Sequence, residues 1–161
     1  MKIRVGFGYD IHRLEEGKRL FLGGVEILFS KGLAGHSDGD CLIHSIIDAL
    51  LGALGEKDIG QQFPDTDDEY LNIRSTILLK KVAIMLNDRG AEVLNIDSVI
   101  VAEQPKLKTF IPEMKKNLCD ILNIDRTSLG IKAKTNEGLD ATGRGEAVAA
   151  YVTVLIKMDE E

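Results

Sequence analysis

The chain has 161 residues, of which 44% are hydrophobic and 29% are charged, and its formal net charge is −6. This length predicts a single domain over residues 1–161 that buries a substantial core. The acidic balance and the lack of any Lys/Arg cluster argue against a nucleic-acid or anionic-membrane surface. An anionic ligand would therefore need another source of positive charge, such as a metal ion.

Cysteine usage and hydropathy indicate the compartment. Cys41 and Cys119 are far apart in the sequence and give no disulfide pattern. The opening segment MKIRVGFGYD lacks the apolar core of a signal peptide, and the longest apolar run, 147–156, is too short to span a bilayer as a helix. We therefore expect a cytoplasmic protein with reduced thiols.

The first third of the chain predicts a strand, a hairpin and a helix. Residues 3–12 alternate and are rich in β-branched side chains, and residues 19–27 resemble a hairpin that turns at Gly23-Gly24. Apolar residues then recur at helical spacing over 42–54 and stop at Gly55, which predicts a helix ended by glycine.

The rest of the chain alternates strands and helices. A polar loop (58–70) is followed by a predicted helix (about 69–88, ended by Gly90) and a strand (92–103). A loop (104–112) then runs into a helix that ends at Leu122. The last predicted elements are a strand (129–135), a glycine-rich turn (136–146) and a strand (147–157). Three helices for about five strands predict an α+β fold, with helices layered on one face of a mixed four- to five-stranded sheet.

The three histidines of the chain all lie in its first third, close to carboxylates. Asp10 and His12 are two apart on a predicted strand, so their side chains leave the same face. His44 lies on the first helix, and packing this helix over the strand would bring it to the pair. Three protein ligands with an open fourth position are typical of a catalytic zinc-type site. Asp48, one helical turn further, is a candidate orienter of His44.

Spacing alone leaves other interpretations open. An Asp-x-His pair is more often a surface pair than a ligand pair. His44 shares a polar stripe with Asp40 and Asp48, where a histidine is more often solvated than ligating. Cys41 has Cys-x-x-His spacing to His44, although its leucine neighbours favour a small buried thiol.

Two loops carry weaker signals. FPDTDD at 63–68 fails as an EF-hand because Thr76 stands where the twelfth-position glutamate belongs, so it is either an exposed acidic turn or a mobile lid. The late loop offers Thr135, Glu137 and Arg144 beside several glycines, as a phosphate-binding loop would. It matches neither GxxxxGK[ST] nor GxGxxG, and a tight connecting turn explains it equally well.

Taken together, the motifs point to one family. They are GYDIHRL, GHSDGD followed by His44, DIGQQFPDTD, AEQPKL and KTNEGL with TGRGE. In their order and spacing, from about Arg4 to Lys157, the chain resembles the 2-C-methyl-D-erythritol 2,4-cyclodiphosphate synthases of the non-mevalonate isoprenoid pathway. The resemblance implies a lyase reaction. The 2-phosphate of 4-diphosphocytidyl-2-C-methyl-D-erythritol 2-phosphate attacks the β-phosphorus, CMP leaves, and a cyclic diphosphate forms.

The same resemblance implies two metal ions and a shared active site. Asp10, His12 and His44 would bind Zn²⁺, or Mn²⁺ or Co²⁺, while Glu137 would hold Mg²⁺ or Mn²⁺ with the substrate diphosphate. His36, Thr135 and Glu137 would be catalytic. The family forms homotrimers whose active sites lie between subunits, with no nucleic acid or membrane involved.

The resemblance also implies a substrate-binding set. Its members are Asp10, His12, His36, Ser37, Asp58, Ile59, Gly60, Phe63, Pro64, Asp65, Thr66, Asp67, Ala102, Glu103, Gln104, Pro105, Lys106, Leu107, Lys108, Lys134, Thr135, Asn136, Glu137, Ala141 and Arg144. Lys134, Asn136 and Ala141 depart from the threonine, threonine and aromatic that many relatives carry. The alternatives are a metal-dependent nucleotide phosphodiesterase and a non-catalytic trimeric module that binds a nucleotide or isoprenoid phosphate.

Overall fold

A mixed five-stranded sheet with the order β4-β1-β7-β5-β6 forms one layer of the computed structural model, which describes residues 1–159. Its strands are β1 (Lys2–Glu16), β4 (Lys31–Leu33), β5 (Ala91–Val101), β6 (Leu129–Lys134) and β7 (Ala147–Met158). Strands β5 and β6 pair in parallel, whereas β1 pairs antiparallel with β4 and β7, and β5 with β7. The predicted α+β class and mixed sheet are confirmed.

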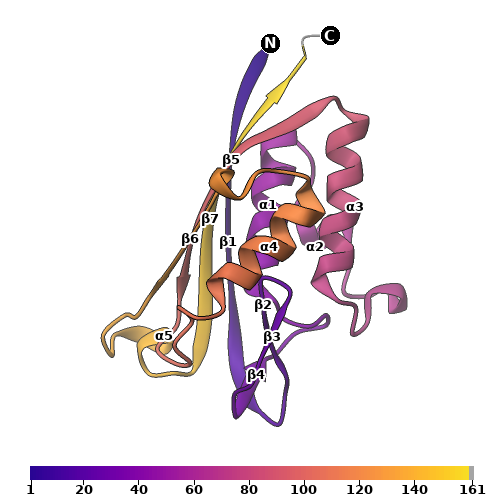
Figure 1. The fold of residues 1–161 in the computed structure, drawn as a ribbon. Helices are drawn as coiled ribbons and strands as arrows, with labels where there is room; N and C mark the ends of the chain where they lie inside the picture. Colours follow the sequence, from indigo (N-terminus) through magenta and orange to yellow (C-terminus); the bar gives the residue numbers. More distant parts are fainter. Residues whose placement is uncertain (160–161) are drawn as a thin grey trace.

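The three long helices lie on one side of this sheet (Figure 1). They are α1 (Cys41–Leu54), α3 (Ser75–Asp88) and α4 (Ile111–Leu122). The short elements are the hairpin strands β2 (Leu20–Leu22) and β3 (Val25–Ile27), the helices α2 (Ile59–Gln62) and α5 (Asp140–Gly143), and the 3-10 turns η1 (Asp68–Tyr70) and η2 (Arg126–Ser128). Within residues 1–159, no helix has both the length and the apolar character needed to cross a membrane.

Two glycines of β1 let α1 pack directly on this strand. A Cβ atom at Gly6 would lie 1.8 Å from the carbonyl oxygen of Ala49, and one at Gly8 would lie 1.9 Å from that of Ser45. Only glycine fits such an approach between helix and strand backbones. The alternation of β1 then directs the next two even-numbered side chains, Asp10 and His12, toward the same helix.

The carboxylate of Asp40 fixes the start of α1. It accepts hydrogen bonds from the backbone N–H groups of Ile43 (3.0 Å), Gly23 (3.0 Å) and Gly24 (2.8 Å), so it caps the helix and ties it to the β2–β3 turn. The predicted polar stripe of the helix is therefore not solvated at this end, since Asp40 is fully buried and His44 is 9% exposed.

The opposite face of β1 exposes apolar side chains. Ile3, Val5, Phe7, Tyr9 and Ile11 alternate with the residues that face α1, and each is more than 40% exposed. Tyr9 stands beside its cross-strand neighbour on β7, with the two tyrosine ring centroids 5.0 Å apart. The sheet thus has one face covered by helices and one apolar face left open along β1.

The predicted boundaries are wrong in the middle of the chain. The second helix begins at Ser75 rather than near Glu69, because Asp67 caps the separate η1 turn and Asn72 adopts a left-handed backbone conformation (φ 57°). The segments predicted as loop and turn contain the short helices α2 and α5. The first helix ends at Gly55, as predicted.

Candidate metal centre

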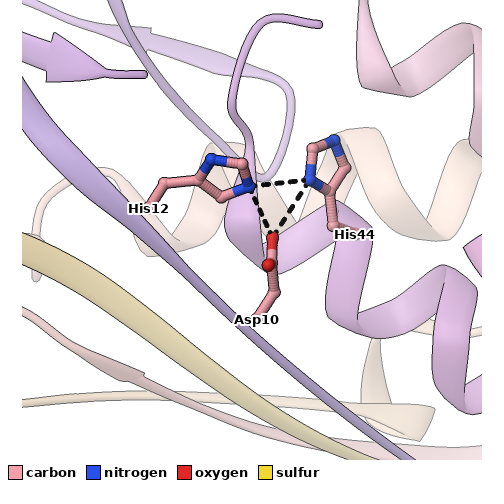
Figure 2. A group of neighbouring side chains, drawn as sticks. All are labelled: Asp10, His12 and His44. Carbon is pink, nitrogen blue, oxygen red and sulfur yellow. Dashed lines mark hydrogen bonds and ion pairs between the residues drawn. The ribbon is translucent and has the colours of Figure 1, made fainter. Parts of the chain in front are cut away.

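Asp10, His12 and His44 converge at one point between β1 and α1 (Figure 2). Oδ2 of Asp10 lies 2.8 Å from Nε2 of His12 and 3.0 Å from Nδ1 of His44, and these two nitrogens are 3.2 Å apart. The strand alternation and the helix packing expected from the sequence therefore bring the three side chains together. Cys41, the alternative ligand, is fully buried and is not part of this group.

The surrounding contacts leave a lone pair on His12 Nε2. Nδ1 of His12 makes a short hydrogen bond with the carbonyl oxygen of Ala34, which can only accept, so Nδ1 carries the hydrogen. In the neutral imidazole, Nε2 is then an acceptor that faces the carboxylate of Asp10. Two such acceptors in contact require a positive charge between them. One carboxylate and two imidazoles fit a divalent metal of the zinc type.

The pKa shifts of Asp10 and His12 also favour a positive charge between the two side chains. Burial raises the pKa of Asp10, but its hydrogen bonds and charge interactions with His12 and His44 outweigh this and hold the pKa below its ordinary value. Burial lowers the pKa of His12, but the hydrogen bond to Asp10 and its negative charge raise the pKa overall. The metal-free centre therefore holds a proton on His12 more strongly than a free imidazole does, and metal binding must compete with that proton.

The second nitrogen of His44 faces two hydroxyl groups. Its Nε2 lies 2.8 Å from Oγ of Ser75, at the start of α3, and 3.0 Å from Oγ of Ser37. Asp48, the orienter expected from helical spacing, instead accepts a hydrogen bond from the backbone N–H of Ile59 at 2.8 Å. No sequence pattern marks Ser75 as a partner of His44, because this contact joins segments that are distant in the chain.

A cavity of about 240 Å³ opens beside the metal centre. Its lining residues are Asp10, His12, Gly35, His36, Ser37, His44, Ile59, Gly60, Phe63, Asp65, Tyr70, Ile73 and Leu78. The cavity therefore brings the three candidate metal ligands together with His36 and with four of the predicted residues of the 58–67 segment. Sequence reasoning missed its apolar members Tyr70, Ile73 and Leu78, since nothing in their spacing separates cavity wall from core.

The other residues of the predicted 58–67 set do not line this cavity. Asp58 caps α2 and accepts from the backbone N–H of Gln61 at 2.9 Å. The carbonyl oxygen of Asp67 lies 3.4 Å from Nε2 of His36, so the acidic loop reaches the histidine that precedes α1. Pro64 is half-buried and Thr66 exposed within this loop.

The remaining predicted residues form a second group. Within the part of the chain that the structure describes, no residue of 102–108 or 134–144 lines the 240 Å³ cavity. The backbone N–H of Ala102 donates to the carbonyl oxygen of Lys134 at 2.9 Å, which joins these two segments to each other. In Figure 1, α5 and the end of β6 lie at the lower left, apart from α2 on the helical side of the sheet.

The late loop is held by its own side chains. Nδ2 of Asn136 donates to Asp140 and to Thr142, both at 2.8 Å, and Arg144 pairs with Glu146 at 2.9 Å. Hydrogen bonds from Thr142 and Asn136 lower the pKa of Asp140 to about 2. Glu137 is exposed and has a left-handed backbone (φ 50°), and Thr135 and Ala141 are half-buried. The side chain of Glu137 is thus free to meet a ligand from outside.

The fold and this centre define an α+β protein with a candidate catalytic metal site. The chain belongs to the YgbB family, whose model matches residues 3–157. It is 54% identical over 159 residues to the 2-C-methyl-D-erythritol 2,4-cyclodiphosphate synthase of Bacteroides thetaiotaomicron, covering 99% of this chain and 100% of the relative. The family inferred from the sequence motifs is therefore confirmed.

Solved structures show the same fold. The bifunctional IspDF of Campylobacter jejuni superposes with a TM-score of 0.93 at 41% identity over 99% of this chain, which spans 43% of that longer chain. The CDP complex of IspF from Plasmodium falciparum gives a TM-score of 0.85 at 35% identity, covering 98% of this chain and 97% of that one. A fold relative of nearly equal length thus binds CDP.

Proposed function

We propose that the chain is a 2-C-methyl-D-erythritol 2,4-cyclodiphosphate synthase that converts 4-diphosphocytidyl-2-C-methyl-D-erythritol 2-phosphate into the cyclic diphosphate and CMP. The observation that carries the proposal is the convergence of Asp10, His12 and His44 beside a cavity lined by His36 and Ser37. It stands in a chain that matches a synthase of that name over its full length. The reaction takes place in the cytoplasm.

The reaction needs no protein nucleophile. An oxygen of the substrate 2-phosphate bonds to the β-phosphorus, the bond from that phosphorus to the oxygen bridging the two phosphates breaks, and this oxygen leaves with CMP. The protein has to hold the attacking and leaving oxygens in line and to neutralise charge around phosphorus. His36 and Ser37, at the mouth of the metal centre, bind the reacting phosphates. Thr135 stabilises them from the late loop.

Two divalent ions complete the site. Asp10, His12 and His44 hold Zn²⁺, or Mn²⁺ or Co²⁺, and Glu137 holds Mg²⁺ or Mn²⁺ with the substrate diphosphate. Bound ions of this kind supply positive charge that polarises phosphate oxygens. Their positive charge also offsets the repulsion between a protein of net charge −6 and a polyanionic substrate.

The substrate spans both groups of predicted residues. Asp58 to Gly60 bind the ribose, and the 63–67 loop covers the methylerythritol above the cavity. Residues 102–108 form the cytosine and phosphate pocket, with Lys106, Lys134 and Arg144 near the phosphates. Oε2 of Glu103 is buried and has no hydrogen-bond partner among the described residues, so it offers an acceptor to an amino donor such as that of cytosine.

The active site forms between subunits of a homotrimer. Two features support this assembly. The late loop and the 102–108 segment contribute nothing to the cavity wall within one described chain, so a second copy has to supply them. The exposed apolar face of β1, which includes Val5 and Phe7 at 65% and 63% exposure, provides a surface for subunits to bury.

Turnover of two variants tests the proposal. We expect His36→Ala and Glu137→Gln to lower kcat for CMP release by about 10²–10³-fold each, as loss of a transition-state contact does. Both variants are expected to keep the zinc-type ion, because neither residue belongs to the Asp10 centre. If both release CMP at the wild-type rate, the assigned roles are wrong. A protein that binds CDP but never releases CMP from the substrate would be a binding module instead.

A further inference from the structure

Asp38 and Ser75 form a buried pair directly behind His44. The side chain of Asp38 is 4% exposed, and its Oδ2 accepts hydrogen bonds from the backbone N–H of Ser75 at 3.0 Å and from Nε of Arg74 at 3.1 Å. Its Oδ1 accepts from the backbone N–H of Asp40 at 3.2 Å and makes a short hydrogen bond with Oγ of Ser75. All four of these hydrogen bonds are donated to the carboxylate, so both of its oxygens act as acceptors.

The direction of the Ser75 hydroxyl follows from this arrangement. A hydroxyl group has one hydrogen, and Ser75 donates this hydrogen to Oδ1 of Asp38. Oγ of Ser75 must then act as an acceptor toward Nε2 of His44, 2.8 Å away. Nε2 of His44 must therefore donate, so the hydrogen of the neutral imidazole lies on Nε2. The lone pair then lies on Nδ1, the nitrogen that faces Asp10 and His12.

Of the two other contacts of this ring, one favours the opposite tautomer and one favours neither. Nδ1 of His44 lies 3.0 Å from the carboxylate of Asp10, which by itself would attract a hydrogen to Nδ1. The hydroxyl of Ser37, 3.0 Å from Nε2, can donate as readily as accept, because no carboxylate fixes its hydrogen. The orientation of Ser75 is therefore the contact that selects the metal-binding tautomer. In metal sites generally, one ring nitrogen of a histidine can bind the metal when the other nitrogen donates its hydrogen to an acceptor.

We propose that Asp38 and Ser75 are positioning residues that hold His44 in the tautomer able to bind the zinc-type ion. Neither residue lines the 240 Å³ cavity or belongs to the three-ligand group, and the effect passes through Nε2 of His44. The inference rests on the proposed metal centre of Asp10, His12 and His44. It goes beyond that centre because it assigns a function to Ser75, on α3, and to Asp38, in the loop before α1.

The test is the zinc affinity of the metal-free protein, measured by competition with a chromophoric chelator in the absence of substrate. We expect Ser75→Ala to weaken zinc binding about 10–100-fold, the usual cost of losing a contact behind a ligand. Ser37→Ala is the matched control, since it removes the other hydroxyl on the same nitrogen and should lose far less zinc affinity than this range of about 10–100-fold. Ser98→Ala, which removes a buried hydroxyl bonded to Gly130, controls for general destabilisation.

The outcomes distinguish a failure of the positioning function from a failure of the metal centre. Equal affinities for Ser75→Ala and wild type would overturn the positioning function, and so would equal losses in Ser75→Ala and Ser37→Ala. His44→Ala is measured alongside them. If His44→Ala loses zinc while Ser75→Ala keeps it, only the positioning function fails; if His44→Ala keeps zinc, the metal centre itself is wrong.

Discussion

Nε2 of His12 lies 2.8 Å from Oδ2 of Asp10, although the hydrogen of the neutral imidazole is held on the other ring nitrogen by the carbonyl of Ala34. Two acceptors meet here, and only a proton or a cation between them makes the contact favourable. The strand supplies both groups from one face, and α1 adds His44 above them. The arrangement of these side chains therefore favours binding of a positive charge even without substrate.

Removing one imidazole should release the ion. We expect His44→Ala to retain no stoichiometric zinc after purification and dialysis, because two remaining ligands bind a zinc-type ion far more weakly than three. His36→Ala, which changes a nearby histidine outside the centre, is the control and should keep its zinc. Atomic absorption measures the metal content of both variants. Full zinc occupancy in His44→Ala would contradict the assignment of His44 and make Cys41 the alternative candidate ligand.

The stability of the protein should depend on pH in opposite directions with and without metal. Burial lowers the pKa of His12, but the hydrogen bond and charge of Asp10 raise it overall above the ordinary 6.5. In chelator, this contribution is therefore full below about pH 6.5 and is lost as the pH rises through the raised pKa of the folded state. With excess zinc, stability should instead rise over the same range, because metal binding releases the proton.

Urea unfolding midpoints between about pH 6 and pH 8 measure this contrast, since the range brackets the ordinary histidine pKa. The difference between the zinc and chelator curves isolates the centre from other titrating groups. In His12→Gln the difference should vanish. Parallel curves for the wild-type protein would show that no proton is exchanged for metal at His12.

Asp40 should be a major source of stability through backbone contacts alone. Asp40→Ala leaves the buried N–H groups of Gly23 and Ile43, and the half-buried N–H of Gly24, without an acceptor. We expect a loss of about 2–6 kcal/mol in the free energy of unfolding, from about 1–3 kcal/mol for each of the two buried groups. Asp40→Asn keeps one oxygen and should cost roughly half as much. A loss below about 1 kcal/mol for Asp40→Ala would contradict this account of the α1 cap.

The open face of β1 should carry the subunit contact. Phe7→Glu places a charge on this apolar surface, so we expect the trimer to dissociate to monomers at micromolar concentration, as light scattering would show. Leu28→Glu is the matched control, because Leu28 is 99% exposed and lies outside β1. A wild-type protein that is monomeric, or a Phe7→Glu variant that stays trimeric, would remove the basis for the shared active site.

Much of the metal centre could be predicted from the sequence because its signals are periodic. Alternation on a strand placed Asp10 and His12 on one face, and helical spacing ending at Gly55 placed His44 on a helix. The second helix begins later than predicted. Its helical sequence pattern extends back to about Glu69, but the cap at Asp67 and the left-handed backbone of Asn72 separate the η1 turn from the helix.

The surroundings of the centre could not be predicted in the same way. Ser75 meets His44 across 31 positions of the chain, and no local pattern marks such a contact. Asp48 had helical spacing in its favour, yet it bonds to the backbone of Ile59, because the loop after α1 folds back over it. Tertiary packing decides these partners, and it depends on residues that a periodic pattern does not connect.

The most direct test of the proposed function is phosphorus NMR of the reaction run in ¹⁸O-enriched water. The wild-type protein with 4-diphosphocytidyl-2-C-methyl-D-erythritol 2-phosphate, zinc and magnesium should give CMP and the cyclic diphosphate, neither containing ¹⁸O, because the attacking oxygen belongs to the substrate. Asp10→Ala should give neither product. Linear phosphates carrying one ¹⁸O would show that water attacks instead, and the chain would then be a metal-dependent phosphodiesterase.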